Sequence, residues 1–509
     1  MLLNFIHTLL FLTAAFTIAV EPVCAQNKTL DENALARFEK SVAQGKIEEI
    51  ERPLLDLAVA NPNNPRILEL LAAARFQQNR LAESAALSKR VLTLDADSAA
   101  AKINLARILY LSEKPDEARR MLDSIAEKSL TGEVLRLDLA AVFLQIGAPE
   151  EALAATEKLA LKTKNSSALP VIAASYAALK NGAKLRELLP AIKRAAVNPN
   201  LLLPLAEALR NAGMNREAAD LLRARLAAAP NDFDVLTALG KLEIAARDFA
   251  SAEKHLASAA KLQPRSAEVF VAQAALENGR GNFSNALELL RQAAAIAPAS
   301  TEILPQIVLT AIRANQSRTA IEAAQTLAKV RPDAPESLYL LGAAYLQGGD
   351  TARAQSNLQH LMELRPNDSR GCLALGLTFA AQNDQLETAR KQLARCLEID
   401  PQDVEAAHQL GLSYKAQGEN GKAVEYLEAA VKIAPNYAVA WRDLGVVYLQ
   451  TGAENKARTA LEKAVALAPE DADTHFQLSR LYNLTGESAL AKKHLEMFQT
   501  LKNAPKSSM

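Results

Sequence analysis

The feature that most constrains the fold is a regular spacing of prolines through the second half of the chain. They lie at Pro230, Pro264, Pro298, Pro332, Pro366, Pro401, Pro435 and Pro469. Each step is 34 residues except the step from Pro366 to Pro401, which is 35. Extended backwards, this frame predicts fourteen units that start near residues 31, 65, 99, 133, 166, 199, 233, 267, 301, 335, 369, 404, 438 and 472. A period of this length indicates an array of structural repeats, because one such unit cannot bury both of its faces without neighbours.

Residues 438–471 show the unit most clearly. A first apolar stripe with helical spacing is formed by Trp441, Leu444, Val447 and Tyr448. Gly452 follows, and glycine tolerates the positive φ that closes many helices. A second stripe is formed by Ala457, Leu461, Ala464 and Val465. Pro469 ends it, because proline lacks an N–H and its ring clashes with the preceding turn. The unit is therefore predicted to be two antiparallel helices joined by a tight turn.

The frame can be tested at a position that did not define it, the position of Gly445. The fourteen units have Phe38, Ala72, Ala106, Ala140, Ala173, Ala206, Gly240, Ala274, Val308, Gly342, Gly376, Gly411, Gly445 and Ser479 there. Twelve of the fourteen residues are Gly, Ala or Ser, which would let the paired helices approach closely.

This pattern of Trp, Leu-Gly, Tyr, Ala, a large apolar residue, Ala and Pro resembles the tetratricopeptide repeat family. The resemblance implies an all-α, right-handed superhelical solenoid of antiparallel helix pairs over residues 31–503. In that family the first helices of the pairs line a concave surface, which commonly takes peptides or extended segments. The unit at 166–198 is predicted to be degenerate, and Pro190 is expected to kink or shorten its second helix.

Composition and motifs exclude several function classes. Lys plus Arg and Asp plus Glu both number 58, so no large basic field is present to hold nucleic acid. None of the six histidines is predicted to form an HExxH motif or a close pairing with a carboxylate. GxGxxG, GxxxxGK[ST] and GxSxG motifs are absent, and no Cys/His spacing resembles a zinc site. We therefore predict no enzyme activity, no cofactor and no metal.

The N-terminus predicts export. The apolar run from about Leu9 to Val20 is short for a membrane span and suits the core of a signal peptide over residues 1–25. No Lys or Arg precedes that run, so an uncleaved anchor and a chance apolar start stay open as alternatives. Residues 26–30 are predicted to be a linker and residues 504–509 a tail. The predicted location is periplasmic or secreted, most simply in a bacterial envelope.

Export changes how the cysteines are interpreted. Beyond residue 25 the chain has Cys372 and Cys396, both in the unit that starts at 369. They occupy facing positions of one helix pair, so a disulfide is geometrically feasible in an oxidising compartment. The alternative is two separate small core residues, because free cysteine is commonly buried.

The predicted function is binding of a protein partner. The side chains predicted to line a partner-binding groove are Tyr110, Arg210, Lys241, Asn278, Arg313, Tyr339, His408, Arg442 and Arg480. Apolar residues predicted between them include Ile103, Leu137, Val271, Leu309, Leu377, Leu412 and Val446. A groove of mixed apolar and basic character suits an apolar or amphipathic peptide or helix. This predicts a non-catalytic interaction scaffold of the cell envelope. Two alternatives are an accessory component of envelope assembly or polysaccharide export, associated with a membrane complex, and a structural solenoid that assembles with copies of itself.

Overall fold

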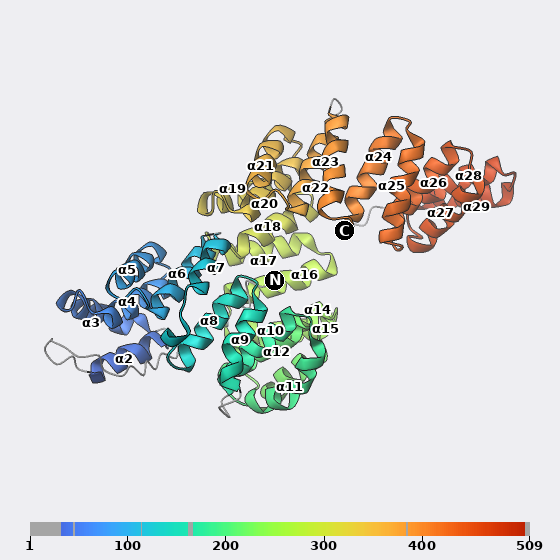
Figure 1. Cartoon of the computed structure of the whole chain (residues 1–509). Coiled ribbons are helices and arrows are strands. Elements are labelled where there is room, and N and C mark those ends of the chain that lie inside the picture. Colours follow the sequence, from blue (N-terminus) through green and yellow to red (C-terminus); the bar gives the residue numbers. More distant parts are fainter. Residues whose placement is uncertain (1–31, 44–45, 113, 161–165, 383–384, 504–509) are drawn as a thin grey trace. The chain divides into compact units, whose positions relative to one another are not determined.

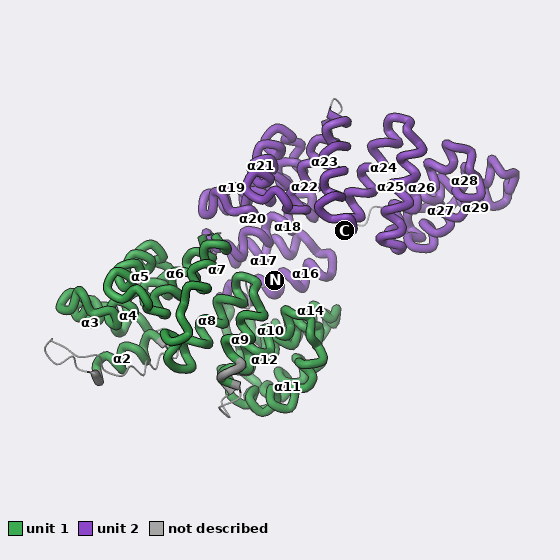
Figure 2. Tube along the Cα trace, viewed as in Figure 1, with its two compact units in different colours: residues 1–264 green, residues 265–509 purple. Residues whose placement is uncertain are grey.

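The computed structural model describes residues 32–43, 46–112, 114–160, 166–382 and 385–503. These residues form 28 α-helices and two short 3₁₀ helices, with no strand among them. The chain divides into two compact units, residues 1–264 and residues 265–509 (Figure 2). The predicted signal peptide, linker and tail lie outside the described residues.

Unit 1 contains the first fourteen described α-helices (Figure 1). They are α2 (Glu32–Ala43), α3 (Ile47–Ala60), α4 (Pro65–Gln77), α5 (Leu81–Leu94), α6 (Ala99–Leu111), α7 (Pro115–Asp123), α8 (Glu133–Gln145), α9 (Pro149–Ala160), α10 (Leu169–Ala178), α11 (Gly182–Ala195), α12 (Pro199–Asn211), α13 (Asn215–Ala228), α14 (Phe233–Ala245) and α15 (Phe249–Leu262). The 3₁₀ helices η1 (Glu127–Ser129) and η2 (Ser166–Ala168) precede α8 and α10.

Unit 2 contains the other fourteen described α-helices. They are α16 (Ala267–Arg280), α17 (Phe283–Ile296), α18 (Ile303–Arg313), α19 (Ser317–Val330), α20 (Pro335–Gln347), α21 (Thr351–Leu364), α22 (Ser369–Ala380), α23 (Leu386–Ile399), α24 (Val404–Ala416), α25 (Asn420–Ile433), α26 (Ala438–Gln450), α27 (Glu454–Leu467), α28 (Ala472–Leu484) and α29 (Ser488–Asn503).

Each predicted repeat is one helix pair, with an even-numbered first helix and an odd-numbered second helix. Within each unit, helices that follow one another in the chain pack together, and first helices of successive pairs also contact each other, as α22 does with α24. The turn after α26 has Gly452 at φ +72°, which confirms the predicted helix-closing role. The prediction of an all-α solenoid of antiparallel helix pairs is confirmed.

The small-residue position has a direct steric reason. A Cβ added at Gly445 would lie 2.6 Å from Cγ of Leu461, a residue of the partner helix α27. The equivalent Gly411 faces Leu427 in the same way, at 2.7 Å. A leucine of the second helix therefore fills the space that a side chain on the first helix would need.

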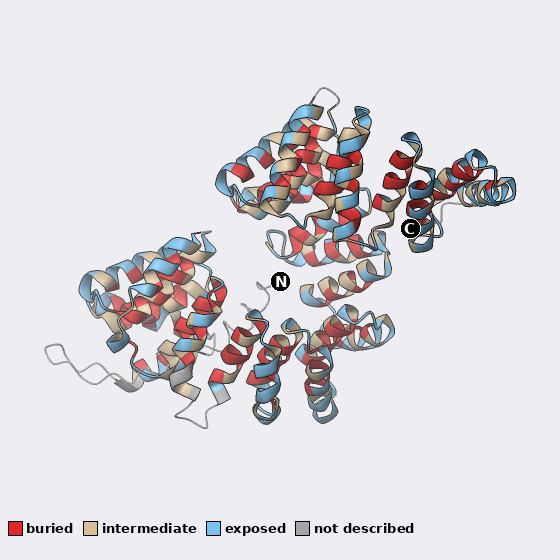
Figure 3. Ribbon diagram, turned by 45° about the vertical axis from the view of Figure 1, so that its right-hand side comes forward, coloured by how far each residue is buried: buried red, intermediate tan, exposed pale blue. Residues whose placement is uncertain are grey.

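Buried residues lie mainly where helices face each other (Figure 3). In the last pairs of unit 2 the core includes Leu427, Leu444, Leu461 and Leu478, all at most 2% exposed. Burial of aliphatic side chains from both helices of a pair and from the next pair stabilises the stack, at about 25 cal/mol per Å² of apolar surface.

The pair α10–α11 is the least regular in unit 1. Its first helix starts at Leu169, after η2, and α10 packs more extensively against α12 than against its own partner α11. Of the two effects expected of Pro190, a kink or a shorter helix, the shortening is wrong, because Pro190 lies inside α11, which is 14 residues long. Pro190 is exposed, so the carbonyl that loses its helical donor can be hydrated.

No helix among the described residues is long and apolar enough to cross a membrane.

Candidate functional site

The predicted groove residues share positions on the first helices. Aligned on α26, they occupy the positions of Arg442, Val446, Leu449 and Gln450, which are the fifth, ninth, twelfth and thirteenth of the repeat. We call these positions the first-helix face. Tyr110, Arg210 and Lys241 lie on it in unit 1, on α6, α12 and α14. The other six lie on it in unit 2, from α16 to α28: Asn278, Arg313, Tyr339, His408, Arg442 and Arg480.

Exposure differs strongly among these residues. Arg313 and Arg480 are exposed, and Leu309, one turn before Arg313 on α18, is 47% exposed. Val271 is half-buried, and Leu377, Leu412 and Val446 are also half-buried. In unit 1 Ile103 is 2% exposed, so it belongs to the core and the prediction that it faces a groove is wrong.

Several predicted residues have local partners. The guanidinium of Arg210 donates to Glu207, with Nε 2.9 Å from the carboxylate. Arg370 lies over the ring of Tyr339, with Cζ 5.1 Å from the ring centroid. Asn278 donates through Nδ2 to Oγ1 of Thr310 at 2.9 Å, which joins α16 to α18. Tyr110 and Lys241 are half-buried in unit 1.

His408 does not belong to an accessible surface, which corrects the sequence prediction. It is 3% exposed, and its Nε2 lies 2.8 Å from Oδ2 of Asp443 on the next first helix. The ring also packs edge-on against Tyr437, with centroids 5.3 Å apart. The hydrogen bond to a carboxylate 35 residues further along the chain therefore holds this histidine between α24 and α26.

The same contacts explain the electrostatics around Arg442. Burial works to raise the pKa of Asp443, but the hydrogen bond from His408 and the positive charge of Arg442 outweigh it and lower the pKa. Burial works to lower the pKa of Arg442, but Asp443 and Asp471 outweigh it and raise the pKa. Arg442 donates to Asp471 at 3.2 Å, so its charge is largely balanced within the protein.

The first-helix face of unit 2 carries cations and apolar side chains without carboxylates. Its charged side chains other than the buried His408 are Arg313, Lys415, Arg442 and Arg480, and no Asp or Glu occupies these positions from α16 to α28. Arg313 has no ion-pair partner within the part of the chain that the structure describes. Lys415 and the 38% exposed Phe476 belong to the same face but were missing from the predicted set. Their position in the repeat identifies both.

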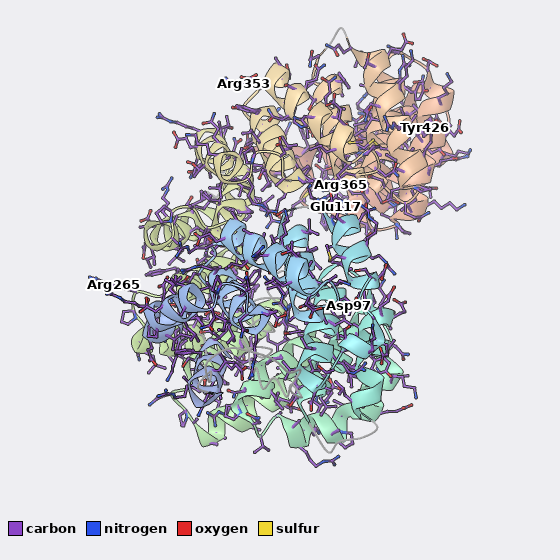
Figure 4. All side chains as sticks on the ribbon, turned by 60° about the vertical axis from the view of Figure 1, so that its left-hand side comes forward. Asp97, Glu117, Arg265, Arg353, Arg365 and Tyr426 are labelled. Carbon is purple, nitrogen blue, oxygen red and sulfur yellow. A yellow bond between two sulfur atoms is a disulfide. The ribbon has the colours of Figure 1, made fainter. Side chains whose placement is uncertain are left out.

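Charges on the second helices are paired with carboxylates more often. Arg353, labelled at the surface in Figure 4, donates to Asp350 at 2.6 Å and lies over the ring of Tyr345. Arg390 on α23 donates to Glu419 of the following repeat at 2.9 Å, and Arg458 pairs with Glu487 in the same way. The contacts of Arg390 and Arg458 each join one repeat to the next. The unpaired cation Arg313 lies instead on a first helix.

Cys372 and Cys396 are joined as a disulfide between α22 and α23, with their Cα atoms 5.6 Å apart. Both residues are fully buried. Among the described residues no group of three or more His, Cys, Asp or Glu side chains could hold a metal ion.

Comparison with known proteins supports the repeat assignment. Models of the tetratricopeptide repeat family match residues 75–130, 237–301, 306–369 and 403–470. No curated protein matches the chain in sequence.

Several solved structures are similar to this chain. A tetratricopeptide repeat protein from Parabacteroides merdae is 16% identical, with a TM-score of 0.43 over 48% of this chain and 97% of that one. The Cut9–Hcn1 hetero-tetramer of the APC/C is 15% identical, with a TM-score of 0.43 over 94% of this chain and 95% of that one. MamA from Desulfovibrio magneticus is 23% identical, with a TM-score of 0.32 over 34% of this chain and 97% of that one.

The proline period over residues 230–469, the glycine–leucine contacts in five of the described helix pairs and the four family matches indicate the same repeat unit. The chain belongs to the tetratricopeptide repeat family.

Proposed function

We propose that this protein is a non-catalytic scaffold of the cell envelope that binds a partner protein along the first-helix face of unit 2. The observation that carries the proposal is Leu309 on α18. Its side chain is 47% exposed, and the exposed Arg313 follows one turn later without a carboxylate on the same face.

This surface suits a helix or extended segment with apolar side chains and carboxylates. Each apolar side chain of the partner that packs against this face would contribute about 25 cal/mol of binding free energy per Å² of apolar surface buried. Cations at the rim would favour carboxylates on the partner and would mainly raise the association rate and selectivity. Tetratricopeptide repeats generally act as protein-binding scaffolds, which agrees with the proposed function.

The envelope location rests on the sequence of residues 1–25, which lie outside the described residues. The location is therefore part of the proposal, and fractionation of the native cell tests it directly. Recovery of the mature chain in the cytosol would remove this part of the proposal and leave the binding face to be tested separately.

The binding face can be tested with a photo-crosslinking amino acid placed at single positions of the exported chain. Leu309 is the test position, and Leu364 on α21 is a matched control because it is 45% exposed but lies on a second helix. We expect an adduct with a second protein from position 309 and little from position 364.

The variant Leu309→Glu should then weaken recovery of the same partner from a crosslinker placed at Val446, whereas Leu364→Glu should not. Equal adducts from positions 309 and 364 would contradict binding on the first-helix face. Adducts that contain a second copy of this chain would favour the self-assembling solenoid instead.

A further inference from the structure

Two histidines face each other across the last helix pair of unit 2. Nδ1 of His475 on α28 lies 2.9 Å from Nδ1 of His494 on α29. His475 is 5% exposed, whereas His494 is half-buried and stacks on the ring of Tyr482 with centroids 5.5 Å apart. The centroids of the two imidazole rings are 5.1 Å apart, so the facing nitrogens lie close to the line between the rings. This is the arrangement of a straight N–H···N hydrogen bond.

The backbone decides which nitrogen of His475 carries the proton. Nε2 of His475 lies 2.9 Å from the carbonyl oxygen of Pro469, which can only accept, so Nε2 must be the donor. The preceding repeat makes the same contact 34 residues earlier, where Trp441 Nε1 donates to the carbonyl oxygen of Pro435 at 3.0 Å. In the last repeat, Nε2–H of His475 therefore makes the hydrogen bond that the indole N–H of Trp441 makes in the preceding repeat. In its neutral form His475 presents a bare Nδ1, to which Nδ1–H of His494 donates.

This geometry limits the number of protons that the pair can hold. One additional proton is tolerated, because a protonated His494 still donates through Nδ1–H to a neutral His475. A second additional proton would place N–H against N–H at the present distance and leave two like charges in contact.

Few charged groups around the pair could offset the repulsion between two protonated imidazoles. Burial, His475 and Lys493 lower the pKa of His494, while Glu462 on α27 works to raise it. The carboxylate of Glu462 also accepts from Oη of Tyr482 at 2.9 Å, and Arg458 of α27 lies over the same tyrosine ring.

We propose that His475 and His494 form an acid-sensitive latch that holds α29 against α28 and releases it when both imidazoles are protonated. With α29 released, each histidine can bind a proton with an ordinary pKa of about 6.5, so the open form binds one proton more than the closed form. Closure is then complete above about pH 6.5 and weakens about tenfold for each pH unit below it. Opening uncovers the face of α28 that carries Tyr482, whose ring stacks on His494 in the closed form.

Hydrogen exchange on the full chain, corrected for the intrinsic pH dependence of exchange, measures the opening. Between about pH 7.5 and pH 5.5 we expect protection of residues 488–503 to fall about tenfold. The same molecule contains a control in α15, where Nδ1 of His255 lies 2.7 Å from a carboxylate oxygen of Glu243. Protonation strengthens that pair, so acid should not lower protection of residues 249–262.

The variant His494→Gln separates the latch from a general effect of acid. A glutamine amide can donate to a neutral His475 or accept from a protonated one, so protection of α29 should become nearly independent of pH. The proposal is overturned if wild-type α29 shows no fall with acid, or if the variant keeps the wild-type fall.

A titration of the full wild-type chain with ¹³C-labelled histidine gives a second measurement if the variant does not fold. His475 and His494 should titrate in two separated steps. A single step for both at an ordinary histidine pKa would also overturn the latch.

Discussion

At the scale of single residues, polar side chains take their roles from partners one repeat away. His408 looks like a surface residue of α24, yet Asp443 of the next first helix draws it into the interior. Tyr448 and Tyr482 show the same rule on another surface, because each donates its hydroxyl to a glutamate of the preceding second helix, Glu428 and Glu462. Burial and these carboxylates raise the pKa of both tyrosines, that of Tyr482 to about 12. Such contacts tie consecutive repeats in register.

Glu69 on α4 gives a residue-scale prediction. Burial is the main reason that its pKa is raised, although Ser98, which donates to its Oε1 at 2.5 Å, works to lower it. Because the pKa of Glu69 is higher in the folded state than in the unfolded state, this carboxyl stabilises the fold at pH values below its unfolded-state pKa. That stabilisation is lost as the pH rises through the folded-state pKa. Glu69→Gln keeps an acceptor for Ser98 without the charge, so we expect a stability gain on the order of 1 kcal/mol near pH 7.5.

Urea unfolding near pH 7.5 and near pH 4 measures this effect. The gain should shrink at the lower pH, where the wild-type carboxyl takes up its proton. If Glu69→Gln is less stable than the wild type at both pH values, the folded protein stabilises the charged carboxylate of Glu69 better than its burial suggests.

At the scale of helices, the close approach inside each pair makes the glycine position sensitive. Gly445→Ala places a methyl group against Leu461, and overpacking of this kind costs about 1–3 kcal/mol, more than the helix propensity that alanine adds. Gly421 near the start of α25 is a matched control, because a Cβ there meets nothing within 4 Å. We expect Gly421→Ala to be neutral or slightly stabilising and Gly445→Ala to lower the unfolding midpoint. Equal effects of both substitutions would refute the steric explanation.

The disulfide gives a second prediction for an element, the pair α22–α23. Cys372 and Cys396 are separated by 24 residues. Closure of a loop of this size stabilises a fold by about 3.5 kcal/mol in the chain-entropy model. Dithiothreitol should therefore lower the stability of unit 2 in the wild-type chain. The double variant Cys372→Ala with Cys396→Ala should not respond to reductant. Alkylation of Cys372 and Cys396 without prior reduction would show that the chain lacks the bond.

At the scale of the whole molecule, the contacts are local along the chain within each unit. Each helix packs on its sequence neighbours and on the next pair, so stability is approximately a sum of repeat and interface terms. Removal of residues 267–300, which form α16 and α17, should leave the remaining repeats able to stack. We expect circular dichroism to show a helical chain with a lower melting temperature. Complete loss of the helical signal would contradict the additive description.

The sequence by itself determined the repeat architecture, because helix propensity, proline positions and small residues act within one unit and recur in each. Helix pairs, the turn at Gly452 and the crowded position at Gly445 follow from residues at most one repeat apart. Tyr110, Arg210, Lys241 and the other predicted face residues also fall on first helices for this reason.

The tertiary structure alone decided which of those side chains are accessible and which have partners. Burial of His408 depends on Asp443, the bond between His475 and His494 depends on the packing of α28 on α29, and exposure of Leu309 depends on what its neighbours leave uncovered. These are relations between residues of different helices, whose distances arise only when the repeats stack. A period in the sequence therefore specifies the shape of each unit, whereas hydrogen-bond partners and solvent exposure are set by the assembled interfaces.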